Sequence, residues 1–88
     1  MYTNQQTREL ARRFDKAADA MRTLANAEEL VARCTPKEGV PASKEDWAEF
    51  DQAREQWGIK AGMAKEATEA ASAAATAFFK ALEEELGS

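Results

Sequence analysis

Residues 34–43, CTPKEGVPAS, decide the fold, because they interrupt a chain that otherwise favours helix. The segment contains both prolines of the protein, one glycine and few apolar side chains. Pro36 disfavours a helical conformation at Thr35, since its ring clashes with the backbone of the preceding residue. The pattern predicts a loop over residues 35–43 with a helix on each side.

The segment before the loop carries the repeat of an amphipathic helix. Its positions are spaced alternately four and three residues apart, which places them on one stripe of a helix. The predicted stripe consists of Leu10, Phe14, Ala17, Met21, Leu24, Glu28 and Val31. We therefore expect a first helix over about residues 4–34.

The segment after the loop begins with helix-start signals. Ser43 is a typical N-cap residue, and Glu45, Asp46 and Glu49 follow it where carboxylates meet the positive end of the helix dipole. The alternation then continues without a phase change through Trp47, Phe50, Arg54, Trp57, Ala61, Ala64, Thr68, Ala71, Ala75, Phe78 and Leu82. A second, longer helix over about residues 44–86 is predicted. The expected fold is all-α, an antiparallel two-helix hairpin forming a single domain over residues 1–88.

Two glycines leave an alternative open. Gly58 and Gly62 each destabilise a helix interior by roughly 1 kcal/mol relative to alanine. A break at this point would divide the second helix and give a three-helix bundle. Spaced four apart, the glycines would instead allow another backbone to approach one face closely.

A symmetric turn about Gly39 predicts which residues face one another. It places Leu10 and Phe14 opposite residues 64–68, so that large side chains meet small ones, as dense packing of two helices requires. It also leaves every residue after Thr76 without a partner on the first helix. The side chains expected to overhang are Phe78, Phe79, Leu82 and Leu86.

This overhang is the predicted partner-binding site. Its apolar side chains recur every three or four residues, as in helices that dock into a groove of another protein. Glu83, Glu84 and Glu85 lie at the negative end of the helix dipole, where a basic partner surface would offset their mutual repulsion. The alternatives are that the first helix bends over these side chains or that the tail frays.

The second helix has another apolar face, made of Ile59, Gly62, Met63, Ala67, Ala70 and Ala74. Helices with two apolar faces usually pack against two neighbours. We therefore expect a homodimer in which two hairpins form a four-helix bundle, with these residues as the dimer face. The alternative is that alanine, a strong helix former, simply covers a solvent-exposed face.

The side chains that usually carry catalysis or bind metals are scarce. The sequence has no histidine and one cysteine, Cys34, so it predicts no disulfide framework, no metal site and no cofactor. Cys34 has no histidine to activate it, and its predicted place at a helix C-terminus favours the unreactive thiol. A thin hairpin offers no deep pocket in which burial would separate the pKa values of two carboxylates. We therefore expect a protein that is not an enzyme.

Composition narrows the function classes further. The net charge of −4 disfavours nucleic-acid binding, which calls for a basic stripe, and nucleic-acid binding or nucleic-acid mimicry remains as the second alternative. Neither a signal peptide nor a membrane span is recognised, so a cytoplasmic location is expected, with export by a specialised system left open. The leading hypothesis is a small adaptor or inhibitor that binds a larger protein. A secreted or chaperone-bound helical hairpin is the alternative.

Overall fold

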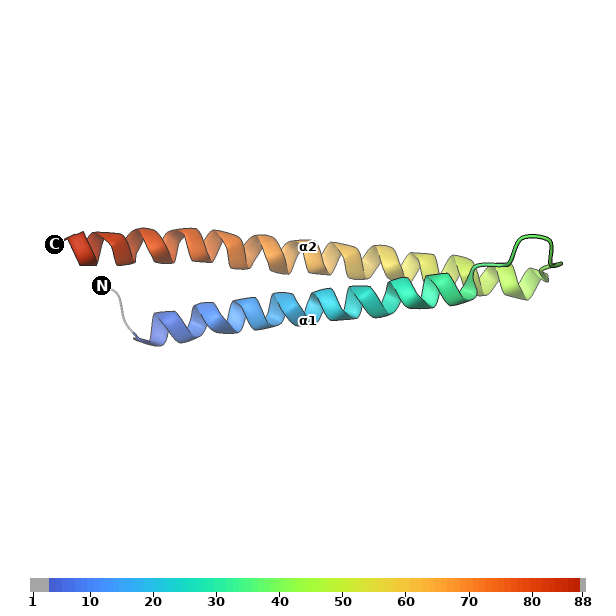
Figure 1. Ribbon diagram of the computed structural model, residues 1–88, viewed down its shortest axis with the longest axis horizontal. Coiled ribbons are helices and arrows are strands. Elements are labelled where there is room, and N and C mark those ends of the chain that lie inside the picture. Colours follow the sequence, from blue (N-terminus) through green and yellow to red (C-terminus); the bar gives the residue numbers. More distant parts are fainter. Residues whose placement is uncertain (1–3, 88) are drawn as a thin grey trace.

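The computed structural model describes residues 4–87 and consists of two long helices joined by one loop. Helix α1 spans Asn4–Cys34 and helix α2 spans Lys44–Gly87, and all regular secondary structure in residues 4–87 is helical. The helices run antiparallel and lie side by side along their length (Figure 1). The molecule is a rod with extents of 69 × 16 × 15 Å. The prediction of a helical hairpin is confirmed.

The start of α2 is fixed by reciprocal hydrogen bonds between Ser43 and Asp46. The backbone N–H of Asp46 donates to Ser43 Oγ over 3.1 Å, and the backbone N–H of Ser43 donates to Asp46 Oδ2 over 2.9 Å. This arrangement is a capping box with aspartate in the place of the usual glutamate. It satisfies two backbone donors that the first turn of a helix leaves without partners.

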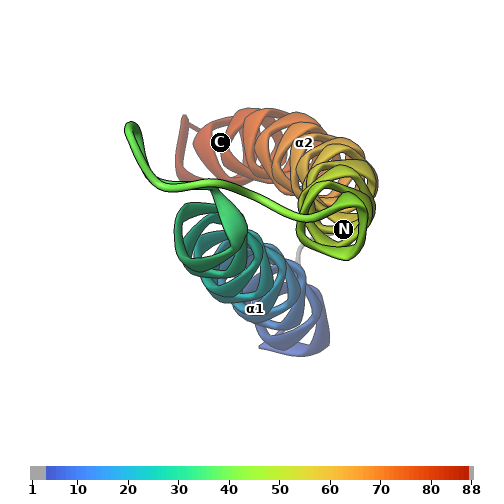
Figure 2. The same ribbon diagram turned by 90° about the vertical axis from the view of Figure 1, so that its right-hand side faces the viewer.

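The loop itself contains one tight turn. The backbone N–H of Val40 donates to the carbonyl oxygen of Lys37 over 3.2 Å, and Gly39 has a φ of 80°. A positive φ at the third position is typical of a type II turn, which favours glycine there. Viewed along the rod, the loop passes over the ends of the two helices (Figure 2).

Helix α2 is continuous across Gly58 and Gly62. A Cβ atom built on either glycine meets no atom within 4 Å, so neither glycine provides a close approach to α1. Both are exposed, and their lack of a side chain is not needed for packing within the hairpin.

The interface between α1 and α2 is made mostly of alanine. Ala64 and Ala71 are each only 1% exposed, which makes them the most deeply buried of the core residues. Small side chains let two helices approach closely and pack densely. The other buried residues are Leu10, Ala17, Ala27 and Ala53. The core is therefore a thin seam along the rod.

The buried seam corrects the predicted stripe on α1. Phe14, Met21 and Glu28, which were predicted to face α2, are exposed, whereas Ala20 and Ala27 lie closer to the interface. A step of four residues turns a helix by about +40° and a step of three by about −60°. Leu10, Ala17, Leu24 and Val31 belong both to the predicted stripe and to the seam. The prediction added the residues four positions after them, whereas the seam uses Ala20 and Ala27, three positions after Ala17 and Leu24. Alanine is favoured at the contact because a row of large side chains would hold the helices apart.

The same correction applies to α2. It holds at Ala53 and Ala67, which are buried or half-buried where the stripe predicted Arg54 and Thr68, both of them exposed. The predicted Ala61, Ala75 and Leu82 are half-buried, as expected. Trp57, Ala64 and Ala71 belong both to the predicted stripe and to the seam, and they are buried or half-buried against α1.

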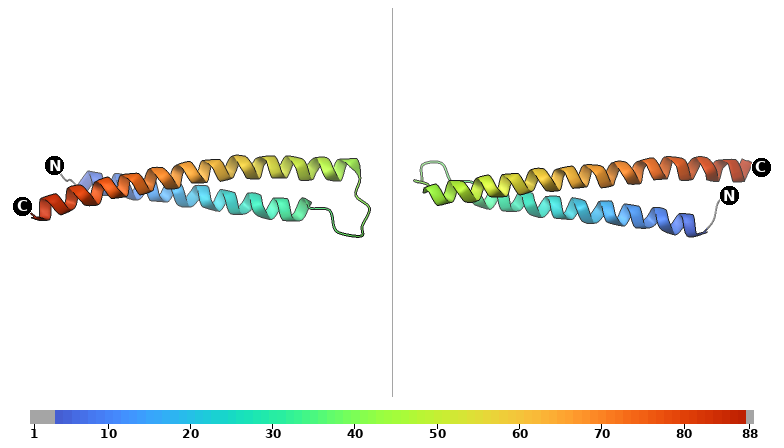
Figure 3. Two further views of the ribbon diagram at one scale, coloured as in Figure 1. Left: turned by 90° about the horizontal axis from the view of Figure 1, so that it is seen from above. Right: turned by 180° about the vertical axis from the view of Figure 1, so that it is seen from behind.

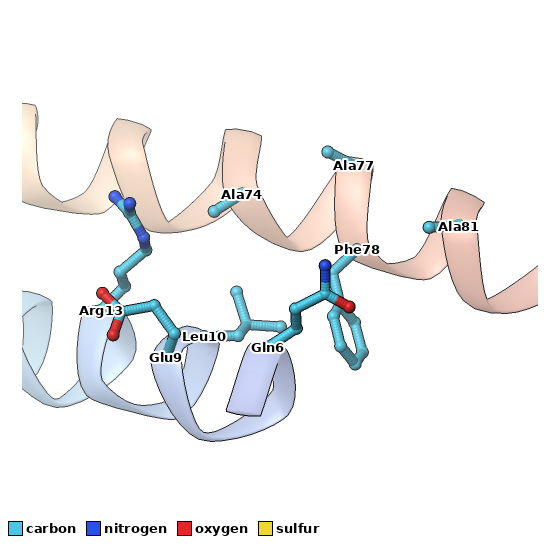
Figure 4. Close-up of a pocket in the computed structure, with 8 residues that line it drawn as sticks. All are labelled: Gln6, Glu9, Leu10, Arg13, Ala74, Ala77, Phe78 and Ala81. Atoms are coloured by element: carbon cyan, nitrogen blue, oxygen red, sulfur yellow. The ribbon is translucent and has the colours of Figure 1, made fainter. Parts of the chain in front are cut away.

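The register between the helices also differs from the prediction. Leu10 lies beside Ala74, Ala77 and Phe78 and not opposite residues 64–68 (Figure 4). At the other end, Cys34 lies beside Glu49, so the first turn of α2 extends beyond the end of α1 (Figure 3). The loop is therefore not a symmetric turn about Gly39, and α2 extends past α1 at both ends.

Candidate binding surfaces

The C-terminal end of α2 extends past the first turn of α1 (Figure 3). Phe79 is 53% exposed and Leu86 is 78% exposed, and Leu82 between them is half-buried. Steps of three and four residues place these three side chains along one edge of the helix. We call Phe79, Leu82 and Leu86, with the exposed carboxylates of Glu83 to Glu85, the anchor segment.

Phe78 does not belong to this overhang. It is half-buried and lines a groove with Leu10 and Gln6 of α1 (Figure 4). Its ring also packs edge to face against Phe79, with centroids 5.1 Å apart and planes at 84°. The prediction that Phe78 has no partner on the first helix is therefore wrong, because the register brings the first turns of α1 over it. Phe78 supports the position of Phe79.

The predicted dimer face is divided in the structure. Ile59 and Met63 are exposed large apolar side chains, and Gly62 and Ala70 are exposed beside them. Ala67 and Ala74 are half-buried at the edge of the interface with α1. The prediction placed these two alanines on a separate face, away from the first helix. That placement is wrong, because the seam on α2 includes them.

One side of the hairpin, which we call the groove face, is lined by shallow depressions between the helices. At one end the depression beside Leu10 and Phe78 has a volume of about 320 Å³ and is bordered by Glu9 and Arg13. Further along, Arg13 and Lys16 face Met63, Glu66 and the alanines of α2. Long basic side chains cover apolar surface with their stems while their charges stay in water. The groove face therefore mixes alanine with charge.

The opposite side of the hairpin is more apolar. Arg13 lies three residues after Leu10 and Phe14 lies four after it, so they project on opposite sides of Leu10. Because Arg13 lines the groove face, Phe14 and the equivalent Met21 lie on the other side. Phe14 is 47% exposed and Met21 is 50% exposed. Ala11, Ala18 and Ala25 continue this surface along α1.

Helix α2 contributes to the same side by the same geometry. Ala81 lines the groove face, so Leu82 lies on the other side of Phe78, and Phe79 and Leu86 project next to Leu82. At the start of α2, Ala53 lines the groove face, which places Trp47 on the opposite side. We call this side the apolar face. Its large apolar side chains are Phe14, Met21, Trp47, Phe79, Leu82 and Leu86, and the polar stripe residues Glu28, Arg54 and Thr68 lie on it as well. The predicted stripe already contained part of this face, because the stripe residues that do not pack between the two helices lie on the apolar face.

Sequence reasoning treated Trp47 as a packing residue, but it is half exposed at the second overhang. Its ring packs edge to face against Phe50, with centroids 5.8 Å apart and planes at 88°. The guanidinium carbon of Arg54 lies 5.9 Å from the centroid of Phe50, within the range of a cation–π contact. A rigid aromatic pair therefore marks the loop end of α2, as Phe78 and Phe79 mark its other end.

Further features of the described residues concern metal ligands, the thiol, ion pairs and membrane insertion. Residues 4–87 contain no group of three or more cysteine, aspartate or glutamate side chains placed to hold a metal ion. Cys34 is a half-buried free thiol. The exposed pairs Arg12 with Glu9 and Arg22 with Asp19 lie within α1, where such pairs contribute little stability. Neither described helix is sufficiently long and apolar to cross a membrane.

Comparisons of the chain with protein-family models, with curated proteins and with solved structures give no match. The function is therefore inferred from the two faces of the hairpin and from the two ends of α2.

Proposed function

We propose that the protein is a non-catalytic interaction module that binds a larger protein through the anchor segment. The observation that carries the proposal is the exposure of Phe79 and Leu86, with the half-buried Leu82 between them, at the end of α2 that extends past α1 (Figure 3). A projecting helix end with apolar side chains on one edge fits a hydrophobic groove on a partner. An adaptor or an inhibitor would use it by covering part of the partner's surface.

The energy of such a complex would come from a few apolar anchors. Phe79 and Leu86 each expose more than half of their surface, and full burial of such a side chain contributes roughly 1.5–3 kcal/mol. The edge-to-face contact of Phe79 with Phe78 restricts its ring before binding, which lowers the entropy lost in the complex. The anchor segment is therefore partly ordered for binding.

The three glutamates favour a basic partner surface. Glu83, Glu84 and Glu85 are exposed and lie at the negative end of the α2 dipole, where they repel one another and the dipole. Arginine or lysine side chains around an apolar groove would relieve this repulsion and would accelerate association. The proposed partner site is thus an apolar groove with a basic rim.

The test is capture of the partner with a photo-cross-linking amino acid at Leu86, followed by affinity measurements with the captured protein. The double variant Phe79→Asp, Leu82→Asp is expected to weaken binding by about 30-fold or more, as loss of a central anchor does. The matched control Ile59→Asp, Met63→Asp introduces the same charges elsewhere on α2 and is expected to bind normally. Equal affinity of the two double variants would contradict the proposal.

A second measurement separates the role of the glutamates. Replacing Glu83 to Glu85 with glutamine should lower the association rate and its dependence on salt, with a smaller change in the dissociation rate. An association rate that does not change in the glutamine variant would contradict the basic rim of the partner site but not its apolar groove.

A further inference from the structure

The isolated hairpin exposes far more surface than a compact protein of its size. Its accessible surface is 7000 Å². A folded monomer of this mass has about 5,100 Å² by the usual scaling of surface with mass. The excess of about 1,900 Å² is larger than the roughly 800 Å² that each partner buries in a standard interface. Part of this surface is therefore sufficient to form a stable dimer.

We propose that a second copy of this chain covers the apolar face, with the two hairpins antiparallel to one another. The two-fold axis would lie across the rods at their middle, so that α1 packs on α1 and α2 on α2 of the other copy. Because α2 extends past α1 at both ends, the middle of α1, near Asp19, lies level with the middle of α2, near Lys65. A single axis can therefore centre both pairs of helices.

The arrangement places large side chains against small ones on α1. With the axis near Asp19, Phe14 of one copy faces Ala25 of the other, and Met21 faces Ala18. Such pairs allow dense packing between helices. Glu28, the acidic side chain within this part of the face, then comes within reach of Arg8 of the other copy.

The arrangement also covers both overhangs of α2. Trp47 lies close to the first residue of α2, and Leu82 and Leu86 lie close to its last. An antiparallel pair of α2 helices aligned along their full length brings Trp47 of one copy between Leu82 and Leu86 of the other. The two exposed apolar ends of α2 therefore cover each other.

The antiparallel and parallel orientations differ in which charges they bring together. A parallel dimer would bring the glutamates at positions 83–85 of both copies together at the same end. In the antiparallel dimer, the start of α2 lies beside those glutamates and brings Lys44 together with the carboxylates Glu45 and Asp46.

The dimer would hide the anchor segment, so binding of a larger protein at that segment requires the dimer to open. This consequence rests on the proposed function, whereas the dimer itself does not. Self-association and partner binding would then compete for Phe79, Leu82 and Leu86.

The closing experiment compares two matched variants by light scattering and sedimentation over a concentration series. Met21 and Met63 are 50% and 54% exposed in the middle of their helices, but Met21 lies on the apolar face and Met63 on the groove face. The unmodified chain is expected at twice 9.7 kDa. Met21→Asp should weaken the dimer at least about tenfold, as a charge in an apolar contact does, and Met63→Asp should not. A monomer at all concentrations, or a dimer lost only with Met63→Asp, would overturn the proposal.

Disulfide trapping tests the orientation and does not depend on how well an aspartate variant folds. In chains carrying Cys34→Ser, an equimolar mixture of Lys44→Cys and Leu86→Cys should form a cross-linked heterodimer on oxidation. Lys44→Cys alone should not cross-link, because the two copies of residue 44 lie at opposite ends. Cross-linking of Lys44→Cys alone, or none in the mixture, would refute the antiparallel arrangement.

The two proposals fail separately. Met21→Asp leaves the anchor segment intact, so it should bind a captured partner at least as tightly as the unmodified chain. A dimer that persists in Met21→Asp refutes only the packing of two copies through the apolar face, whereas lost selectivity for Phe79 and Leu82 refutes only the proposed function.

Discussion

Replacing Ala71 with leucine tests how closely the two helices approach. Ala71 is 1% exposed, and Ala64, two turns earlier on the same side of α2, is equally buried. Leucine adds three carbon atoms at a contact that has no room for them, so the helices must separate or neighbouring side chains must leave their preferred rotamers. Overpacking of this kind destabilises a protein by about 1–3 kcal/mol. Leucine and alanine differ little in helix propensity, so the loss reports tertiary packing.

The assay is urea and thermal unfolding followed by circular dichroism at one fixed protein concentration. For a chain of this size each kcal/mol lowers the melting temperature by roughly 4–8 °C, so Ala71→Leu should melt about 4–24 °C lower. The matched control is Ala73→Leu, because Ala73 is exposed on the same helix, and its stability should change by less than about 0.5 kcal/mol. If Ala71→Leu were as stable as Ala73→Leu, the close alanine seam would be refuted.

Three further predictions concern single residues. Ser43→Ala should destabilise the hairpin by about 1 kcal/mol, since it removes the hydroxyl that accepts from the Asp46 N–H, and faster amide exchange in the first turn of α2 would report the loss. Gly62→Ala should stabilise it by about 0.5–1 kcal/mol in urea unfolding, because the added Cβ meets no atom within 4 Å; a destabilised variant would mean that α2 is not helical there. Gly39→Ala should destabilise it by about 1–2 kcal/mol because of the φ of 80°, and Gly39→Asn should lose less; equal stability of all three chains would argue against the type II turn.

The hairpin could be predicted because its signals are local. Pro36 ends the first helical segment, and Ser43 with Asp46 begins the second through hydrogen bonds between neighbouring residues. Such signals depend on the chemistry of a few adjacent side chains and not on the rest of the fold. The alternation of three and four residues was likewise sufficient to identify two long amphipathic helices.

Register and rotation could not be predicted because alanine specifies neither. Alanine surrounds α2 over much of its second half, so Leu10 finds small side chains opposite it in several registers. The observed register is distinguished by its ends: it covers Phe78 with Leu10 and Gln6 and leaves Trp47 exposed at the loop end. Whether Phe78 or Trp47 is covered depends on how the two helices pack against each other. The spacing of residues within one helix does not contain this information.

The rotation of the helices has a further physical meaning. On α1 the residues in the seam have Ala20 and Ala27 on one side and Phe14 and Met21 on the other, and the hairpin uses the alanine side because it permits the closer approach. Phe14 and Met21 are therefore displaced to the surface, although polar residues at these positions would suit a hairpin that remains alone in water. A wide apolar stripe of which only half is used inside the chain is typical of a helix that contacts two neighbours. Leu82 and Leu86 lie on the same side of the hairpin at the end of α2, so one side links the surface available to a second copy with the end available to a larger protein.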